Sequence, residues 1–277
     1  MKRSFVLLCL GVPTAAVAHT IAAGGTGNQT SDWLGAGIPI LCAAVLYVLG
    51  WVALKARGSS WRAVAFVSGL LTLTLALLSP LDTAGAEFFW VHMVQHETLM
   101  LICAPLLVLG RPLAIFIWAF PRAVRAVIAR AVQQPAVKRT WRTLSSPGTA
   151  WLLHALALWI WHVPALFNAV ATNRFIHDLQ HVSFVATALL FWSALFEERR
   201  AAQQGAGIVY LFTTTIHSSV LGALITFASR PWYSAYGLED QQLGGLIMWV
   251  PGSLVYVGIA LVLLARWIAG SHRQPAT

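Results

Sequence analysis

Residues 88–109 read FFWVHMVQHETLMLICAPLLVL, and Glu97 is the only Asp, Glu, Lys or Arg in this stretch. An apolar run of about 20 residues is long enough to cross the hydrocarbon core of a bilayer as a helix. Two histidines, His92 and His96, lie four residues apart near its start. The stretch therefore predicts a membrane-spanning helix that carries polar side chains near one end.

Six further segments have the same length and apolar character. The 277-residue sequence is 58% hydrophobic and only 10% charged, which is too little charge for a soluble surface. No alternation typical of porin strands is visible, and a helix satisfies its own backbone in lipid. We therefore expect an all-α integral membrane protein, a bundle of about seven transmembrane helices at 33–54, 61–79, 88–109, 149–167, 177–196, 208–228 and 243–267.

The first 18 residues have the features of a cleavable signal peptide. Lys2 and Arg3 precede a short apolar run, and Ala16 to Ala18 form a small-x-small cleavage site. Residues 19–277 would then form a single transmembrane helical domain. Retention of the segment as an uncleaved anchor is the alternative.

The distribution of Lys and Arg predicts the orientation of the chain. Fourteen of these residues fall in loops on one side of the expected spans, and two, Arg174 and Arg230, fall on the other. Because cytoplasmic loops carry the excess of positive charge, we expect the N-terminus outside and the C-terminus inside. The net charge of +9 is thus interpreted as membrane topology, and no nucleic-acid partner is expected.

The longest inner loop, residues 112–146, is basic and amphipathic. Arg122, Arg125 and Arg130 alternate at helical spacing with Val124 and Val127. Such a helix is typical of segments that lie on an anionic lipid surface. A docking site for a partner protein is the alternative.

Histidines at similar depth in the expected spans predict a metal site. His92 and His96, and likewise His177 and His181, are four residues apart, so each pair presents two imidazoles on one helix face. An ionisable side chain inside a membrane span is a functional hypothesis by default, although a structural histidine is the alternative. Imidazole binds zinc, copper, iron or nickel, and the nearby thioethers of Met93 and Met100 favour copper. The candidate metal ligands are His92, His96, His162, His177, His181 and His217.

Other polar and aromatic residues near the same ends of the spans have more general interpretations. Asp178 and Asp240 are candidates for orienting imidazole rings or guiding cations. The amides of Asn168, Gln180, Gln241 and Gln242 are expected at the entrance to the site. Trp33, Trp90, Trp232, Tyr233 and Tyr236 are expected to be interfacial anchors.

Three other classes of protein are alternatives to a copper protein. Two histidines on different helices can ligate haem iron axially, so a membrane b-type haem protein is the serious competitor. An enzyme is not expected, because no nucleophile has a recognisable setting and His96-Glu97 lacks the second histidine of HExxH. A transporter is disfavoured, because the inner half of the spans offers mainly His154.

Four ordered motifs resemble the polytopic CtaG family of cytochrome c oxidase (caa-type) assembly factors. The resemblance covers roughly residues 80–252. The motifs are HMVQH at 92–96 with APLL at 104–107 and LGRP at 109–112; WHVP at 161–164; HDLQH at 177–181 with Phe191-Trp192; and DQQ at 240–242 with Gly244-Gly245 and MWVP at 248–251.

The resemblance implies a multi-pass plasma membrane protein that is needed to make active haem–copper oxidase. Its supposed role is copper handling, so a metallochaperone that metallates an oxidase subunit is expected, with copper as the ion and a homo-oligomer as one possible assembly. A metal-free assembly scaffold stays open as an alternative. The chain departs from the family pattern at Ala104, Glu97 and Phe167, where a proline, an apolar residue and a tyrosine are expected.

Overall fold

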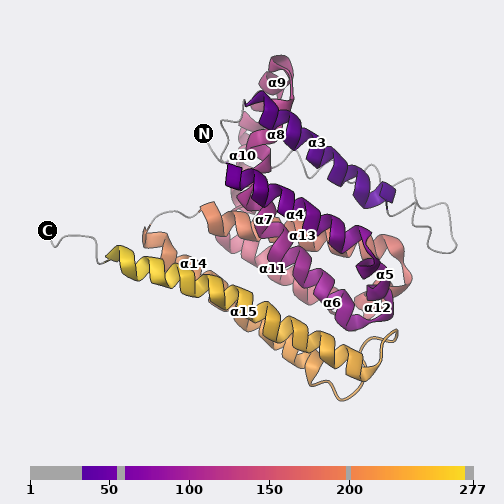
Figure 1. Ribbon diagram of the computed structural model, residues 1–277. Helices are drawn as coiled ribbons and strands as arrows, with labels where there is room; N and C mark the ends of the chain where they lie inside the picture. The colour runs from indigo at the N-terminus through magenta and orange to yellow at the C-terminus, as the bar shows by residue number, and fades with distance from the viewer. Residues whose placement is uncertain (1–32, 55–59, 198–200, 272–277) are drawn as a thin grey trace. The chain divides into compact units, whose positions relative to one another are not determined.

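The structure is a computed structural model that describes residues 33–54, 60–197 and 201–271 (Figure 1). These residues form helices and contain no strand, so the expected all-α class is confirmed. The expected signal peptide, residues 1–18, lies outside the described residues. The described residues divide between two compact units, one within Met1–Asp82 and Ile102–Ser146, the other Thr83–Leu101 and Pro147–Thr277.

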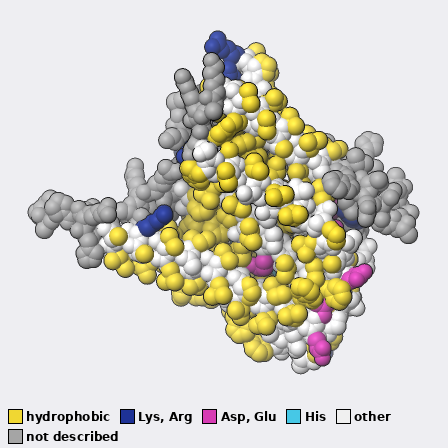
Figure 2. Space-filling view, in the orientation of Figure 1, with side chains coloured by type: hydrophobic (Ala, Val, Ile, Leu, Met, Phe, Trp, Pro, Cys, Tyr) yellow, Lys and Arg dark blue, Asp and Glu magenta, His cyan; other side chains and the backbone are white. Residues whose placement is uncertain are grey.

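Six described helical segments are long and apolar enough to cross a membrane, or up to seven if one bent pair counts as a span. The six run Gly35–Ala53, Ser60–Leu78, Phe89–Ala119, Arg174–Phe196, Gly205–Thr226 and Leu238–Ala269. Many large apolar side chains on them are exposed, including Leu41, Phe212 and Leu254, each by more than 60%. Figure 2 shows hydrophobic side chains over most of the visible face. Apolar surface on this scale is stable only against lipid.

The fourth expected span, 149–167, is broken. Helix α11 (Pro147–Trp161) and helix α12 (Pro164–Thr172) meet at an angle of 74°. The cause is Pro164, whose ring forces the preceding residue out of the helical region. Val163 accordingly has φ −62° and ψ 127°.

In the first unit, helix α3 (Ile38–Ala53) follows a π-helical turn, η3 (Trp33–Gly37), and α4 (Ser60–Leu78) comes next. Tyr47 of α3 stacks on Phe66 of α4 with ring centroids 3.9 Å apart, and its hydroxyl donates to the Gly110 carbonyl at 3.3 Å. Helix α7 (Ala104–Leu109) packs on α4 at Gly69, whose carbonyl accepts a hydrogen bond from the Cys103 thiol at 3.4 Å. This thiol is therefore used in helix packing.

The expected amphipathic loop 112–146 is helical. It forms α8 (Pro112–Phe116), a 3-10 turn η5 (Ile117–Ala119), α9 (Arg122–Gln133) and α10 (Pro135–Leu144). Arg111, in the left-handed region at φ 49°, separates α7 from α8. Arg125 lies over the Trp118 ring at 4.5 Å. The position of segment 112–146 at the inner leaflet stays a prediction.

The second unit contains α6 (Phe89–Glu97), a π-helical segment η4 (Thr98–Cys103) that begins there, and helices α11 to α15. The long helices are α13 (Arg174–Glu197), α14 (Ala201–Thr226) and α15 (Leu238–Ser271). Helix α15 packs on α14 and α6, and α11 packs on α13. Along the chain, the division between the first and second units falls within α5 (Pro80–Glu87).

The wider turn of η4 has a local cause and a local partner. Pro105 follows it and has no N–H to donate, so the regular helical ladder is interrupted there. The indole N–H of Trp192 donates to the Met100 carbonyl at 2.8 Å and so satisfies a backbone group of the π-helical segment. Such segments inside α-helices occur often beside functional sites.

Candidate metal centre

The two predicted histidine pairs face each other between α6 and α13. Within each pair the i,i+4 spacing stacks the rings, with centroids 4.1 Å apart for His92 and His96 and 4.3 Å for His177 and His181. Across the helices, His92 lies 5.3 Å from His177 and 5.9 Å from His181. His96 lies 5.3 Å from His181. Four imidazoles from two helices thus form one cluster, here called the four-histidine cluster.

Three members of the cluster have the geometry of a ligand set. One ring nitrogen each of His92, His96 and His181 lies within 4.8 Å of the other two, and all three residues are buried. Metal–imidazole bonds of about 2.0 Å at tetrahedral angles place two nitrogens about 3.3 Å apart. The three side chains therefore need only a modest inward movement to share one ion.

Hydrogen bonds select the nitrogen that each ring could offer. Nε2 of His92 lies 3.3 Å from Oε1 of the buried Gln180. An amide oxygen only accepts, so Nε2 carries the proton and Nδ1 keeps its lone pair. Nδ1 of His162 donates to the Leu158 carbonyl at 2.7 Å, which leaves Nε2 as the lone-pair nitrogen.

Several of the lone-pair nitrogens have no protein partner. Both ring nitrogens of His96, Nε2 of His181 and Nε2 of His162 are buried without a hydrogen bond. Buried polar groups in folded proteins almost always have a partner, and each exception needs an explanation. Neutral imidazoles with free lone pairs fit a borderline metal ion such as copper or zinc.

His162 borders the cluster, whereas His217 does not. The ring of His162 contacts Phe167 and Phe184 at 6.1 and 6.3 Å, and the same two phenyl rings contact His92 and His96. The ring contact of His217 is with Trp151 of α11, at 5.3 Å. The sequence analysis grouped His217 with the other candidate ligands, whereas the structure places it in another group of side chains.

An aromatic layer covers the helix ends next to the cluster. Tyr233, in the connection between α14 and α15, lies 4.2 Å from Phe167 and 4.9 Å from Phe89. Its hydroxyl donates to the His162 carbonyl, at 3.1 Å, beside the break in the fourth span. Tyr236 contacts Phe89 at 5.5 Å and donates to the Gly85 carbonyl at 3.1 Å.

The interpretation of Tyr233 and Tyr236 as interfacial anchors is wrong, because both side chains are buried against these protein partners. Burial, with a smaller contribution from the nearby Asp240 carboxylate, raises the pKa of Tyr236 to about 12. Burial also raises the pKa of Tyr233. Both hydroxyls therefore stay protonated at neutral pH and can donate to backbone carbonyls.

Asp240 has a role that the sequence did not reveal. Its two carboxylate oxygens accept from the backbone N–H groups of Phe89 and Trp90 at 2.8 and 3.0 Å. The carboxylate from α15 thus caps the N-terminus of α6, where a negative charge also interacts favourably with the helix dipole. It fixes the start of the helix that carries His92 and His96.

The predicted entrance amides hold the α14–α15 connection in place. Gln241 accepts from the Trp232 N–H at 2.6 Å, Gln242 donates to the Ala228 carbonyl at 3.1 Å, and Asn168 accepts from the Ser234 N–H at 2.9 Å. Gln180 alone contacts a histidine of the cluster. These contacts explain why polar side chains gather there, since they bind the backbone of the segment that carries Tyr233.

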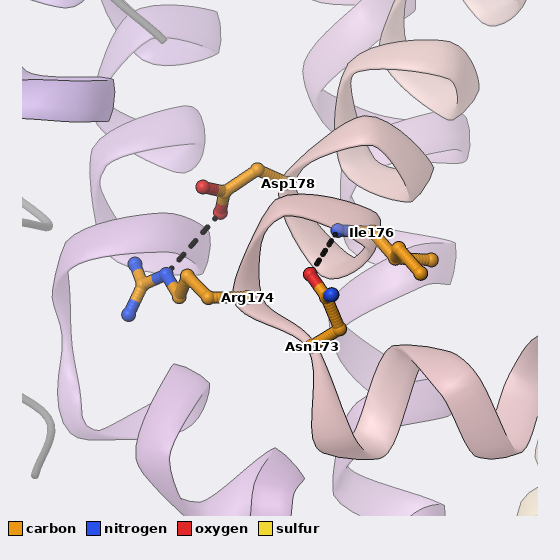
Figure 3. A network of polar contacts seen from close by, with 4 residues as sticks. All are labelled: Asn173, Arg174, Ile176 and Asp178. Carbon is orange, nitrogen blue, oxygen red and sulfur yellow. Dashed lines mark hydrogen bonds and ion pairs between the residues drawn. The ribbon is translucent and has the colours of Figure 1, made fainter. Parts of the chain in front are cut away.

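Asp178, a candidate for orienting imidazole rings, lies near the start of α13. It forms an i,i+4 ion pair with Arg174 at 3.4 Å, and both side chains are nearly half exposed (Figure 3). Asn173 accepts from the Ile176 N–H at 3.2 Å and caps the start of α13 in the same view. These contacts stabilise the first turn of the helix that carries His177 and His181.

Two of the departures from the family pattern, Phe167 and Glu97, lie beside histidines of the cluster in space or in sequence. Phe167 contacts His92 and His162, so a tyrosine there would place a hydroxyl beside two imidazoles. The carboxyl group of Glu97 packs against the backbone of Gly252 in α15, where a Cβ would lie 2.7 Å from Oε2. Met93 and Met100 are buried.

A b-type haem fits this geometry poorly. A porphyrin would have to lie between two axial imidazoles and extend well beyond them on all sides. The rings of the cluster instead contact one another, and Phe167 and Phe184 stand beside His92 and His96 at 5.5 and 4.7 Å. The space that the macrocycle needs is occupied by side chains.

The sequence model of the family described as cytochrome c oxidase caa3 assembly factor matches residues 45–270, which is most of the chain and contains all of the cluster. No solved structure matches the chain.

Similar proteins occur in mycobacteria. An uncharacterized protein of Mycobacterium leprae (strain TN) is 28% identical over 255 residues, which cover 82% of this chain and 38% of the relative. Uncharacterized proteins of Mycobacterium bovis and Mycobacterium tuberculosis are 28% identical over 259 residues, 83% of this chain and 38% of each relative. The chain thus spans less than half the length of these relatives.

Proposed function

The chain belongs to the cytochrome c oxidase caa3 assembly factor family, and from this premise we propose that it binds copper at the four-histidine cluster and supplies the ion to an oxidase subunit. Copper is the cargo of the protein, and no chemical conversion is involved. The role is that of a non-enzymatic metallochaperone in the plasma membrane.

One observation carries the proposal. Nitrogens of His92, His96 and His181 lie within 4.8 Å of one another, and the rings of His96 and His181 present buried nitrogens without a protein partner. The three ligands of this set are all imidazoles, which carry no negative charge when neutral. Such a set suits a singly charged, borderline-soft ion such as Cu(I), whose desolvation costs less than that of a divalent ion.

The surrounding residues support loading and release. His177 and His162 border the three ligands and offer further imidazoles through which an ion could pass by ligand exchange. Gln180 orients His92, and the aromatic layer separates the rings from the helix ends. In the predicted topology these ends face outward, so the oxidase subunit would receive the ion at the outer face of the membrane.

The proposal is tested on detergent-purified full-length protein. Wild type, His92→Ala/His96→Ala and His272→Ala are loaded with Cu(I) under reducing conditions, desalted, and analysed for bound metal together with an optical spectrum. We expect His272→Ala to retain as much copper as wild type and the double variant to bind about one equivalent less. His272 is the matched control because it lies in the C-terminal tail, outside the described residues.

Maturation of the oxidase distinguishes a chaperone from a scaffold. Each variant is expressed in cells that lack the wild-type copy, and cytochrome c oxidase activity is compared with the amount of assembled oxidase. A copper chaperone predicts that the double variant yields assembled but copper-deficient oxidase. Normal activity with the double variant would leave a metal-free scaffold as the function, and a Soret band in the purified protein would indicate a haem protein instead.

A further inference from the structure

A second group of buried polar side chains lies between α11, α13 and α14, away from the four-histidine cluster. His154, 1% exposed, has its Nδ1 3.2 Å from the hydroxyl of Thr187. That hydroxyl already donates to the Ser183 carbonyl at 2.8 Å, so it accepts from His154. The proton of His154 is therefore on Nδ1, and Nε2 carries a lone pair that has no partner.

His217 of α14 adds a second imidazole without a partner. Both of its ring nitrogens are buried and make no hydrogen bond. Trp151 precedes His154 by three residues on α11 and its ring contacts that of His217. Because α14 also packs on α11, His154 and His217 occupy the same region. Trp151 stands edge-on to His217 at 5.3 Å and 89°, and its indole nitrogen is also buried without a partner.

These unsatisfied atoms require an occupant that is not part of the protein. Four buried polar atoms from three neighbouring side chains, in spans that are otherwise apolar, would each cost about 1–3 kcal/mol if nothing bound them. Two of the side chains are imidazoles from different helices that can offer lone pairs. Zinc is disfavoured because it requires four ligands. A singly charged soft ion accepts two nitrogen ligands and can also be stabilised by an adjacent indole ring.

We propose that His154 and His217 form a second metal site that binds one Cu(I) ion with two imidazole ligands between α11 and α14. His154 precedes His162 by eight residues, so the site lies about 12 Å deeper along the axis of α11 at ~1.5 Å per residue. That separation is too large for one ion to bridge both sites. The inference deepens the proposed function, on which it rests, because it assigns a second position to the same cargo.

The test is an anaerobic titration of the full-length protein in detergent with Cu(I) held by a competing chelator. Wild type is expected to bind two equivalents, and His217→Phe and His154→Gln one each. His92→Ala/His96→Ala is expected to keep one equivalent, whose X-ray absorption edge should have the shape of two-coordinate Cu(I) with nitrogen ligands. Thermal unfolding and gel filtration of every variant show whether a loss of copper reflects a loss of fold.

The outcomes separate the two proposals. One equivalent in wild type that is unchanged in His217→Phe and His154→Gln, and lost in His92→Ala/His96→Ala, overturns the second site and leaves the proposed function intact. In that case ordered water occupies the polar group. No copper in folded wild type overturns both. One equivalent that is lost only with His154 or His217 supports the second site and removes the four-histidine cluster as the copper site.

Discussion

Substituting Asp240 by Asn should loosen the helix that carries half of the four-histidine cluster. The carboxylate accepts two backbone hydrogen bonds, from Phe89 at 2.8 Å and Trp90 at 3.0 Å. Asparagine retains one acceptor oxygen and turns its NH2 group toward the other N–H. Because a hydrogen bond to a charged group contributes about 1.5–3 kcal/mol, we expect Asp240→Asn to destabilise the second unit by about 2 kcal/mol.

The assay is thermal unfolding in detergent, followed by intrinsic fluorescence, with a copper titration in parallel. A loss of about 2 kcal/mol corresponds to a fall of roughly 4–8 °C in the unfolding midpoint of a chain of this size. Copper affinity should fall as well, since His92 follows the capped turn. Glu239→Gln is the matched control, because Glu239 is exposed and its substitution removes the same charge one residue away. Equal midpoints for Asp240→Asn and Glu239→Gln would refute the capping argument.

Three further substitutions test the packing of helices and loops in the second unit. Gly222→Ala places a Cβ 2.8 Å from the backbone nitrogen of Trp249, and we expect a loss of about 1–3 kcal/mol in unfolding free energy. Gly258→Ala is the control and should be neutral, because a Cβ there would have nothing within 4 Å. Equal effects of the two substitutions would contradict the tight helix crossing at Gly222. Tyr236 has a pKa raised from 10.0 to about 12, so stability should fall by about 3 kcal/mol as the pH rises through 10 to 12, and Tyr236→Phe should show a shallower alkaline slope. Trp192→Phe removes a 2.8 Å hydrogen bond to η4 and should cost about 1 kcal/mol by chemical unfolding; an unchanged midpoint would show that this carbonyl has another partner.

The sequence predicted the histidine pairs well because helical periodicity is a local property. Residues four apart stack on one face, and the rings of His92 and His96 lie 4.1 Å apart as expected. That the pair on α6 meets the pair on α13 depends on the rotation of each helix about its axis. Rotation is set by packing between helices, so the sequence could not show that His217 meets Trp151.

The break in the fourth span was visible in the sequence, but its meaning was not. Pro164 follows His162-Val163, and a proline disfavours the helical conformation of the residue before it. The length and apolar character of 149–167 nevertheless predicted one continuous span. Whether a proline kinks a transmembrane helix or divides it depends on partners for the freed backbone groups, and here Tyr233, 71 residues away, supplies one.

The roles of Asp240 and the amide side chains could not be predicted for the same reason. A carboxylate near a predicted metal site suggests a contact with imidazole, yet Asp240 binds backbone amides 150 and 151 residues earlier in the chain. Gln241 likewise binds the N–H of Trp232 instead of lining an entrance. Polar side chains at the ends of membrane helices have many backbone groups to satisfy, and composition alone does not identify which.

The hydroxyl groups of Tyr233 and Tyr236 set a timescale for exchange at the histidines. Displacing the α14–α15 connection breaks these two hydrogen bonds to backbone carbonyls together with the three that the amide side chains make to its backbone, at about 1 kcal/mol each. By that measure the displaced conformation has a population well below about 1%. A solute that passes the aromatic layer would therefore reach the histidine rings only while this minor conformation is populated. Its residence time at the rings would follow the opening of the connection rather than the lifetime of any single ligand bond.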